Sequence, residues 1–346
     1  YIDILNQKLP PLEAGTGSTT QSSNPTPTNI VSQPTPTSMT TTGTSVTIAA
    51  VGDMVEGADN SCGSTSCKTK QVSDLIQTIN PAVFLALGDV QYEYGELSDF
   101  NTYYEPTYGR FKSITYPVIG NHEYLDPSAS THYPGDQVSY WTYFGRNGNT
   151  SQKPGNPSQG YYAFNLGAWR LYAINSNCSK AGGCSLSSPQ TQWLKNDLAN
   201  NPKTCQLMYM HHPYISSDSR GFDTSEMQDI WQAFYNAGGD VILAGHSHFY
   251  ERYQPINPSK IVNEAKGIRQ FIVGTGGKNV YDPADPIAKC TNKGVKVECT
   301  SATWGKAFGM LKMTLSSNSY QWQYVQIPND VNPTFADSGT ANCHLS

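Results

Sequence analysis

VFLALGDVQY, residues 83–92, is an apolar run of strand length that stops at a glycine followed by the carboxylate Asp89. A continuous apolar run of this kind is typical of a strand that is buried on both faces of its sheet. Open α/β sheets bind ligands at the carboxyl ends of such strands. We therefore expect Asp89 to lie at a functional edge of a sheet.

A second strand of the same kind comes earlier in the chain. Residues 45–51 form a β-branched run that ends in Gly52-Asp53. Between the two strands, apolar residues recur at helical spacing from Val72 to Ile79, and Asn80-Pro81 ends that helix. Strand, helix and strand make a right-handed βαβ unit, which puts Asp53 and Asp89 at the same edge of a parallel pair.

Three later strands also end in polar residues. The strands 116–119, 206–210 and 241–244 lead into Gly120-Asn121-His122-Glu123, His211-His212-Pro213 and Gly245-His246-Ser247-His248. We predict a hairpin over 161–174 that turns at Gly167, helices over 187–198 and 227–237, and strands at 271–273, 310–315 and 320–325. The Tyr-, Gly- and Pro-rich region 126–159 reads as loop.

Length and charge restrict the class of protein. The chain of 346 residues suits one sizeable domain or two fused sub-domains. A net charge of −5 with 22 Lys and Arg argues against nucleic acid or an anionic membrane surface as the main partner. We expect no membrane span, because no apolar run approaches the ~20 residues needed to cross a bilayer. The chain begins at Tyr1 rather than Met, which we interpret as a processed or trimmed start.

The first part of the chain differs in composition from the rest. Between Ala14 and Gly52 there is no Asp, Glu, Lys or Arg, and residues 16–45 are built largely of Thr and Ser with four prolines. This composition cannot form a core. We predict an extended tail or linker over 1–45 and a catalytic domain over 46–346, with self-association through the tail as one hypothesis for its role.

The eight cysteines fall into a pattern of pairs. Three pairs flank short loops, and two cysteines remain as a long-range pair: Cys62 and Cys67, Cys178 and Cys184, Cys290 and Cys299, Cys205 and Cys343. Four disulfides would indicate an oxidising compartment. Free thiols or a zinc site stay open as the alternative.

Most of the histidines follow predicted strands. Five of the seven do so, together with two aspartates and an asparagine: His122, His211, His212, His246, His248, Asp53, Asp89 and Asn121. Oxygen and imidazole donors without thiolate favour Zn, Fe, Mn or similar ions. About seven such ligands exceed the needs of one ion and suit two ions about 4 Å apart with a bridging carboxylate.

The ordered set of motifs resembles the calcineurin-like metallophosphoesterases, and within them the purple acid phosphatase branch. It consists of Gly52-Asp53, Gly88-Asp89-Val90-Gln91-Tyr92, Gly120-Asn121-His122-Glu123, His211-His212-Pro213 and Gly245-His246-Ser247-His248. The resemblance implies an α/β fold, a four-layer αββα sandwich of two mixed sheets with the site at strand carboxyl ends.

The same resemblance implies a ligand set. Asp53, Tyr92 and His248 would bind one metal, Asn121, His211 and His246 the other, and Asp89 would bridge them. The first ion would be Fe(III), bound to a tyrosinate, and the second Zn, Mn or Fe(II). Val55 stands where the wider superfamily has a histidine ligand, which agrees with Tyr92 serving instead. A packed tyrosine in a Zn or Mn enzyme remains the alternative.

Phosphate esters carry negative oxygens that repel a nucleophile. Two cations bind those oxygens and lower the pKa of a coordinated water, which supplies a hydroxide nucleophile. A leaving alkoxide then needs a proton, for which His122 is the first candidate and His212 the second. His212 could instead orient His211.

These inferences predict a secreted, extracellular or cell-surface phosphatase that hydrolyses small phosphate monoesters. One alternative is a phosphodiesterase acting on nucleotides or phospholipid head groups. The other is a surface or filament-forming structural protein that retains the phosphatase fold.

Overall fold

The computed structural model describes residues 45–57, 68–125, 138–145, 159–218, 225–282, 304–330 and 334–344. The predicted tail up to residue 44 lies outside them, as do Cys62, Cys67, Cys290 and Cys299.

Two large mixed sheets make up this body. The first has six strands in the order β15 (Ser338–Asn342), β14 (Ser319–Gln326), β13 (Gly309–Leu315), β1 (Val46–Val51), β3 (Val83–Leu87) and β5 (Thr115–Val118). The second has seven, in the order β12 (Trp304–Gly305), β10 (Tyr250–Arg252), β11 (Arg269–Val273), β9 (Val241–Ala244), β8 (Cys205–Tyr209), β7 (Trp169–Ala173) and β6 (Tyr162–Leu166). A small parallel pair joins β2 (Val55–Glu56) to β4 (Gln91–Tyr92).

Parallel strands form the centre of each sheet. β1, β3 and β5 run parallel, with Val51 opposite Ala86, and β7, β8, β9 and β11 do the same in the second sheet. Antiparallel strands extend both sheets at their sides. The carboxyl ends of β1 and β3, and those of β8 and β9, therefore lie beside each other, as the sequence predicts.

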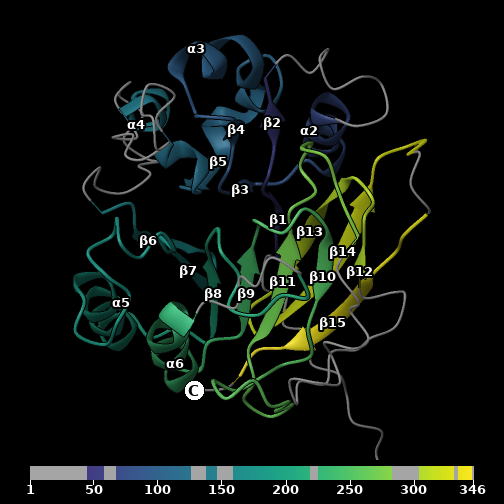
Figure 1. Ribbon diagram of the computed structural model, residues 1–346. Helices are drawn as coiled ribbons and strands as arrows, with labels where there is room; N and C mark the ends of the chain where they lie inside the picture. The colour runs from purple at the N-terminus through teal and green to yellow at the C-terminus, as the bar shows by residue number, and fades with distance from the viewer. Residues whose placement is uncertain are drawn as a thin grey trace, which may run out of the picture. The chain divides into compact units, whose positions relative to one another are not determined.

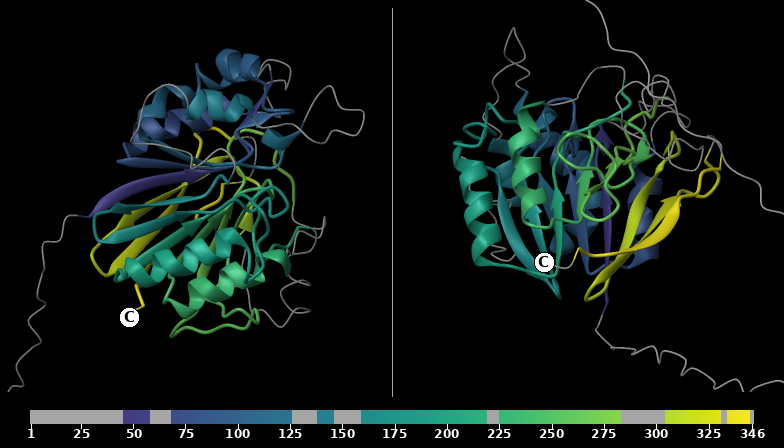
Figure 2. Two further views of the ribbon diagram at one scale, coloured as in Figure 1. Left: turned by 90° about the vertical axis from the view of Figure 1, so that its left-hand side faces the viewer. Right: turned by 90° about the horizontal axis from the view of Figure 1, so that it is seen from below.

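Alternating side chains of the second sheet face two different layers. Leu207, Leu243 and Phe271 belong to the core shared with the first sheet, whereas Met208 and Ile242 belong to a separate core with α5 (Pro189–Asn200) and α6 (Gln228–Asn236). The outer face of the first sheet packs against α2 (Thr69–Ile79), whose buried residues join the larger core. Figure 1 and the left view of Figure 2 show the resulting order of helix, sheet, sheet and helix. The four-layer prediction is confirmed.

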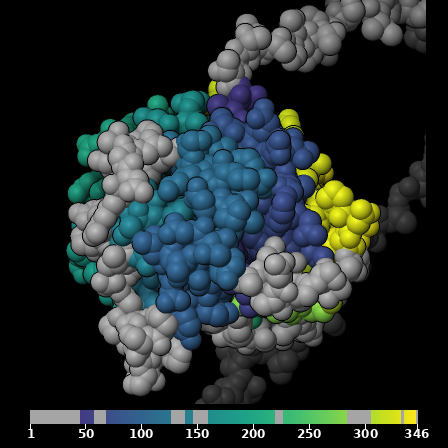
Figure 3. Space-filling view, turned by 90° about the horizontal axis from the view of Figure 1, so that it is seen from above, coloured from purple at the N-terminus to yellow at the C-terminus, as the bar shows by residue number. Residues whose placement is uncertain are grey.

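Helical segments between β4 and β5 cover the first sheet near its edge. They comprise α3 (Leu97–Asp99), a π-helical turn at Phe100–Tyr104 and a 3-10 helix at Tyr108–Ile114. Seen from above, this blue part of the chain fills the middle of the molecular face (Figure 3). None of the helices in the described ranges combines the length and apolar character of a membrane span.

One prediction of a loop was wrong. Residues 126–159 contain α4 (Val138–Phe144), which carries four aromatic residues. Tyr140, Trp141, Tyr143 and Phe144 are all buried, and the Tyr143 ring stacks on Phe100 with centroids 4.8 Å apart. The aromatic residues drive this short helix onto the core, a contribution that its Gly- and Pro-rich surroundings concealed.

Two disulfides that the spacing suggested are present among the described residues. Cys178 bonds to Cys184, and Cys205 at the start of β8 bonds to Cys343 after β15. The long-range bond ties the last strand of the chain to the second sheet. The alternative of free thiols or a zinc site does not hold for these four cysteines.

Candidate metal centre

Polar side chains from both sheets meet where the parallel strands end. Asp53 follows β1, Asp89 follows β3, and Asn121 follows β5. From the second sheet, His211 follows β8, and His246 and His248 follow β9. The structure brings together these residues and Tyr92 of β4.

Tyr92 lies at the centre of a first group of donor atoms. Its Oη is 2.9 Å from Asp53 Oδ1, 3.0 Å from Asp89 Oδ2 and 3.1 Å from His248 Nε2. A phenol carries a single hydrogen and can serve only one of these atoms as donor.

His211 lies at the centre of a second group. Its Nε2 is 3.1 Å from Asn121 Oδ1, 3.2 Å from Asp89 Oδ2 and 3.1 Å from His246 Nδ1. Asp89 Oδ2 is therefore common to both groups.

Backbone carbonyls fix which nitrogen of each ring faces inward. His211 Nδ1 lies 2.9 Å from Leu87 O, and His248 Nδ1 lies 2.9 Å from Asn279 O. A carbonyl only accepts, so each Nδ1 carries a hydrogen, and in the neutral ring, the form that binds a cation, each Nε2 presents a lone pair. Lone pairs of carboxylate, phenol, amide and imidazole thus converge in two adjacent groups, which is the donor chemistry that Zn, Fe or Mn ions require.

The ionised carboxylates of Asp53 and Asp89 are buried, which is energetically unfavourable unless a cation lies beside them. Asp53 is 0% exposed and Asp89 is 2% exposed. In the described part of the chain their ion pairs are with histidine rings. Burial acts to raise the pKa of Asp89, but the nearby charges of His211 and His122 hold it well below its usual range. Burial, followed by the charges of Asp53 and Asp89, raises the pKa of Tyr92. A bound cation would offset the repulsion that keeps this phenol protonated.

The backbone at the strand ends is held in unusual conformations. Asp53, Asp89 and His246 have φ values of 59°, 45° and 70°, a region that residues other than glycine rarely adopt. Such strain persists only where surrounding contacts enforce it and is concentrated at functional sites. Gly120 and Gly245 provide room, because a Cβ on them would lie 2.1 Å from Asp89 Oδ1 and 2.8 Å from Asp53 Oδ2.

Glu123 binds the turns of Asp89 and Asn121 to each other. Its buried carboxylate accepts backbone N–H bonds from Asp89, Val90, Gln91 and Gly120, at 2.7 to 3.2 Å. These four bonds hold the two turns in place, which is a structural role for Glu123.

The two predicted catalytic histidines lie beside different donor groups, His122 beside Tyr92 and His212 beside His211 and His246. His122 lines a cavity of about 410 Å³ beside the donor atoms, with its ring 4.2 Å from the Tyr92 ring. Its Nδ1 is 2.7 Å from Glu93 O. His212 lies 4.4 Å from the ring of His246, and its Nδ1 contacts Ser176 Oγ at 2.9 Å.

Sequence reasoning missed residues on the wall of this cavity. Lys278 Nζ lies 4.5 Å from the centre of the Tyr92 ring and pairs with Glu56 and Glu93. Asn279 and Tyr281 also line the cavity. A signal was available, since these residues follow β11 and the Gly274-Thr275-Gly276-Gly277 run just as the other polar residues follow their strands.

Comparison with known proteins agrees with this geometry. The family model described as calcineurin-like phosphoesterase matches residues 46–250. An uncharacterised protein of Mycobacterium tuberculosis is 25% identical over 262 residues, covering 66% of this chain and 48% of that protein. Purple acid phosphatase 15 of Arabidopsis thaliana is 26% identical over 275 residues, covering 70% and 48%. The chain therefore spans about half the length of the curated relatives it matches.

A solved structure supports the same fold. Purple acid phosphatase PPD1 from seeds of yellow lupin (Lupinus luteus) superposes with a TM-score of 0.66 at 18% identity, covering 87% of this chain and 54% of that one. The family model covers more than half of the chain, and the relatives confirm the resemblance to purple acid phosphatases that the motifs indicate. The chain belongs to the calcineurin-like phosphoesterase family.

Proposed function

We propose that this body hydrolyses phosphate monoesters with two metal ions held at the strand ends. Asp53, Tyr92 and His248 would hold one ion, Asn121, His211 and His246 would hold the other, and Asp89 would serve both. The observation that carries the proposal is the convergence of their lone pairs, with Asp89 Oδ2 3.0 Å from Tyr92 Oη and 3.2 Å from His211 Nε2.

The donor set supports different ions in the two positions. The phenol of Tyr92 and the similarity to purple acid phosphatases support Fe(III) in the first, with Zn, Mn or Fe(II) in the second. When bound, two such ions supply positive charge to phosphoryl oxygens and lower the pKa of a coordinated water.

His122 is suited to deliver a proton to the leaving alkoxide. It lines the cavity and is partly exposed, and its Nδ1 is engaged by Glu93 O at 2.7 Å. This contact leaves Nε2 to face an ester oxygen. Removing the ring by His122→Ala should lower kcat by about 10²-fold, with the greatest loss on alkyl phosphates, whose leaving groups are the most basic.

His212 suits a different role. Burial and the neighbouring charge of His211 lower the pKa of His212 to about 3, so the ring is neutral. A neutral imidazole can donate a hydrogen bond to a phosphoryl oxygen without being a strong acid. We assign His212 to holding that oxygen beside the second ion.

Metal content and turnover test the proposal together. Protein purified gently should hold about two metal ions per chain and hydrolyse 4-nitrophenyl phosphate. A visible absorption band would identify the bond between Fe(III) and Tyr92, and it should vanish in Tyr92→Phe. Protein without metal that stays inactive after addition of Fe, Zn or Mn would reject the proposal.

Asn121→Ala tests one position separately. Loss of this oxygen should weaken the second ion and lower turnover by about 10² or more while the first ion stays bound. Asn200→Ala, at the exposed end of α5, is the matched control and should behave as the parent protein. Retention of both ions and full activity in Asn121→Ala would remove this residue from the ligand set.

Substrate and location are parts of the same proposal. Turnover of mono- and diesters of one alcohol measures the preference directly, and faster diester cleavage would contradict the monoester assignment. Two disulfides among the described residues support an oxidising, extracellular location. Protein recovered from its native source with these four cysteines reduced would contradict that location.

A further inference from the structure

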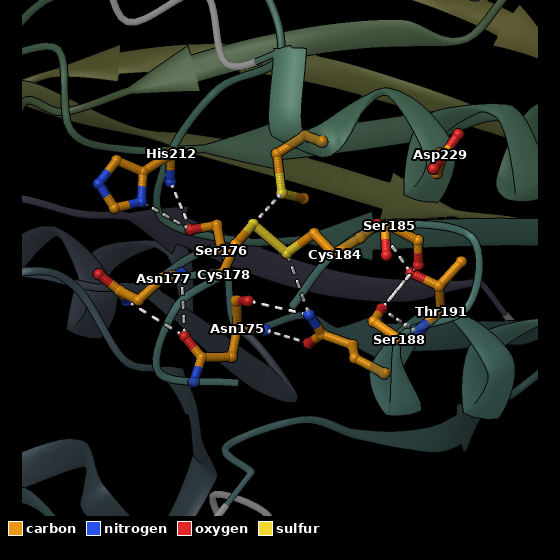
Figure 4. The surroundings of a disulfide bond; sticks show 12 residues. Asn175, Ser176, Asn177, Cys178, Cys184, Ser185, Ser188, Thr191, His212 and Asp229 are labelled. Atoms are coloured by element: carbon orange, nitrogen blue, oxygen red, sulfur yellow. Dashed lines mark hydrogen bonds between the residues drawn. A yellow bond between two sulfur atoms is a disulfide. The ribbon is translucent and has the colours of Figure 1, made fainter. Parts of the chain in front are cut away.

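The segment Asn175-Ser176-Asn177 lies beside the second group of donor atoms, the group centred on His211. It follows β7 directly and is largely buried, with Asn175 fully so. On one side it contacts the turn that carries Asn121. On the other side Ser176 contacts His212, as Figure 4 shows.

Asn177 makes the contacts toward the Asn121 turn. Its Nδ2 donates to the backbone oxygens of Ile119 and Gly120, each at 3.3 Å. These are the two residues that precede Asn121. The segment therefore braces the end of β5 from the side of the second sheet.

Ser176 contacts His212 at two points. Its Oγ accepts the backbone N–H of His212 at 2.8 Å and lies 2.9 Å from Nδ1 of the same ring. One oxygen thus fixes both the backbone and the ring orientation. With Nδ1 engaged, Nε2 is the nitrogen left to meet a group bound beside His211 and His246, whose rings lie 4.9 and 4.4 Å away.

The segment is itself anchored from α5. Gln190 accepts the backbone N–H of Asn175 at 2.8 Å and donates to its carbonyl at 3.0 Å, which is the pairing that a neighbouring strand would provide. The Cys178–Cys184 disulfide closes the loop that follows, and Gln190 Nε2 also contacts Cys184 Sγ. Because the segment is anchored on both sides of Ser176, we expect the Ser176 side chain to keep a fixed orientation.

We propose that Ser176 is a positioning residue for the phosphoesterase reaction, holding the His212 imidazole so that its Nε2 reaches a phosphoryl oxygen. This inference rests on the proposed function. A purely structural serine would affect the stability of the protein without affecting what His212 does.

Single and double variants of the metal-loaded full chain separate these two roles. Ser176→Ala should lower kcat/KM for 4-nitrophenyl phosphate roughly tenfold while metal content stays at the parent level. Ser176→Thr keeps the oxygen and should restore most of the loss. In the double variant with His212→Ala, kcat/KM should be no lower than in His212→Ala alone, because both changes remove one interaction. Ser185→Ala, an exposed serine directly after the loop closed by the Cys178–Cys184 disulfide, is the matched control.

Two results would overturn the assignment. One is a value of kcat/KM for Ser176→Ala within about twofold of the parent, and the other is a double variant whose losses multiply. The NMR signals of the His212 ring provide a readout without turnover, and they should broaden or double in Ser176→Ala but not in Ser185→Ala. An inactive parent protein would reject the proposed function alone, whereas a His212 signal unchanged by Ser176→Ala would reject the positioning role.

Discussion

Gly120 illustrates how tightly single residues are packed around Asp89. The space where its side chain would stand is occupied by Asp89, whose Oδ1 and backbone nitrogen lie 2.1 and 2.2 Å from an ideal Cβ position. On the far side, the N–H of Gly120 donates to Glu123 at 2.7 Å. The turn can therefore neither move away nor accept a methyl group.

Gly120→Ala should displace Asp89 and with it the atom that both donor groups share. We expect loss of both metal ions and of turnover, by about 10² or more, together with a stability loss of about 1–3 kcal/mol from overpacking. Metal analysis and denaturant unfolding measure the two effects.

Gly57→Ala is the matched control, because nothing lies within 4 Å of a Cβ at that position. It should leave metal content and turnover at parent values. Full metal content in Gly120→Ala would mean that the turn can relax around a methyl group, contrary to the 2.1 Å separation from Asp89 Oδ1.

At the scale of elements, the end of the chain is fastened to the second sheet through Asp240. This buried carboxylate precedes β9 and accepts backbone N–H bonds from Gln206 of β8 at 2.8 Å and from His344 at 2.6 Å. His344 follows β15, so one side chain joins strands from both sheets. Burial raises the pKa of Asp240 to about 7, although the two N–H donors oppose the shift.

The raised pKa gives stability a definite pH dependence. An unfolded aspartate titrates near its ordinary pKa of about 3.9. Between about pH 4 and pH 7 the folded protein holds a proton that the unfolded chain has lost, so the contribution of Asp240 to the free energy of unfolding falls as pH rises. Asp240→Asn should remove this decline, which denaturant unfolding at about pH 5 and about pH 8 would measure.

His344 contributes in the opposite sense. Burial lowers the pKa of His344, so its share of the stability rises with pH toward the ordinary histidine value. His344 is present in the parent protein and in Asp240→Asn. The difference between their slopes of unfolding free energy against pH therefore reports on Asp240. Glu264→Gln, at an exposed carboxylate, should leave the slope unchanged. An equal slope in Asp240→Asn would contradict the raised pKa.

The helices and strands that could be predicted from the sequence are those whose apolar residues recur at the spacing of a helix or a strand. The strand 83–87 and the hairpin turning at Gly167 match the structure closely, and α2 begins three residues before Val72 and ends at Ile79 as expected. β15 was not predicted, because Ser338-Gly339-Thr340-Ala341-Asn342 has no apolar face and becomes a strand only by pairing with β14. α4 was missed because it has only 7 residues, too few to show a helical period within a Tyr-, Gly- and Pro-rich stretch of sequence.

The residues of the candidate site also fall into those that the sequence could predict and those that it could not. Asp53, Asp89, Asn121, His211, His246 and His248 could be singled out because each follows a strand, and their meeting follows from the topology of the two sheets. Lys278 follows β11 and could have been noted in the same way, but the roles of Lys278 and Ser176 depend on which distant segments fold beside them. Contacts between residues 36 or more positions apart leave no local pattern in the sequence.

At the scale of the whole molecule, two disulfides constrain very different lengths of chain. Cys178 and Cys184 are 6 residues apart, whereas Cys205 and Cys343 are 138 residues apart. Closing the longer loop removes more conformational entropy from the unfolded chain. In the loop-entropy description the longer loop contributes about 5 kcal/mol to stability and the shorter loop about 2 kcal/mol.

Paired Cys→Ala variants test this difference. Removing Cys205 and Cys343 should lower the free energy of unfolding by more than removing Cys178 and Cys184. All four cysteines are buried, so the cavity contributions are similar. Denaturant unfolding measures both, and an equal or reversed order would show that strain or residual structure outweighs loop entropy.

The position of β1 also has a mechanical consequence. β1 pairs with β13 over residues 46–50 and with β3 over residues 48–51, so it is an interior strand of its sheet rather than an edge strand. A force applied at Val46 would load both ladders in shear, and their hydrogen bonds would share it instead of opening one at a time. Asp53 stands two residues beyond the end of β1, so tension strong enough to pull out that strand would dismantle the metal centre in the same event.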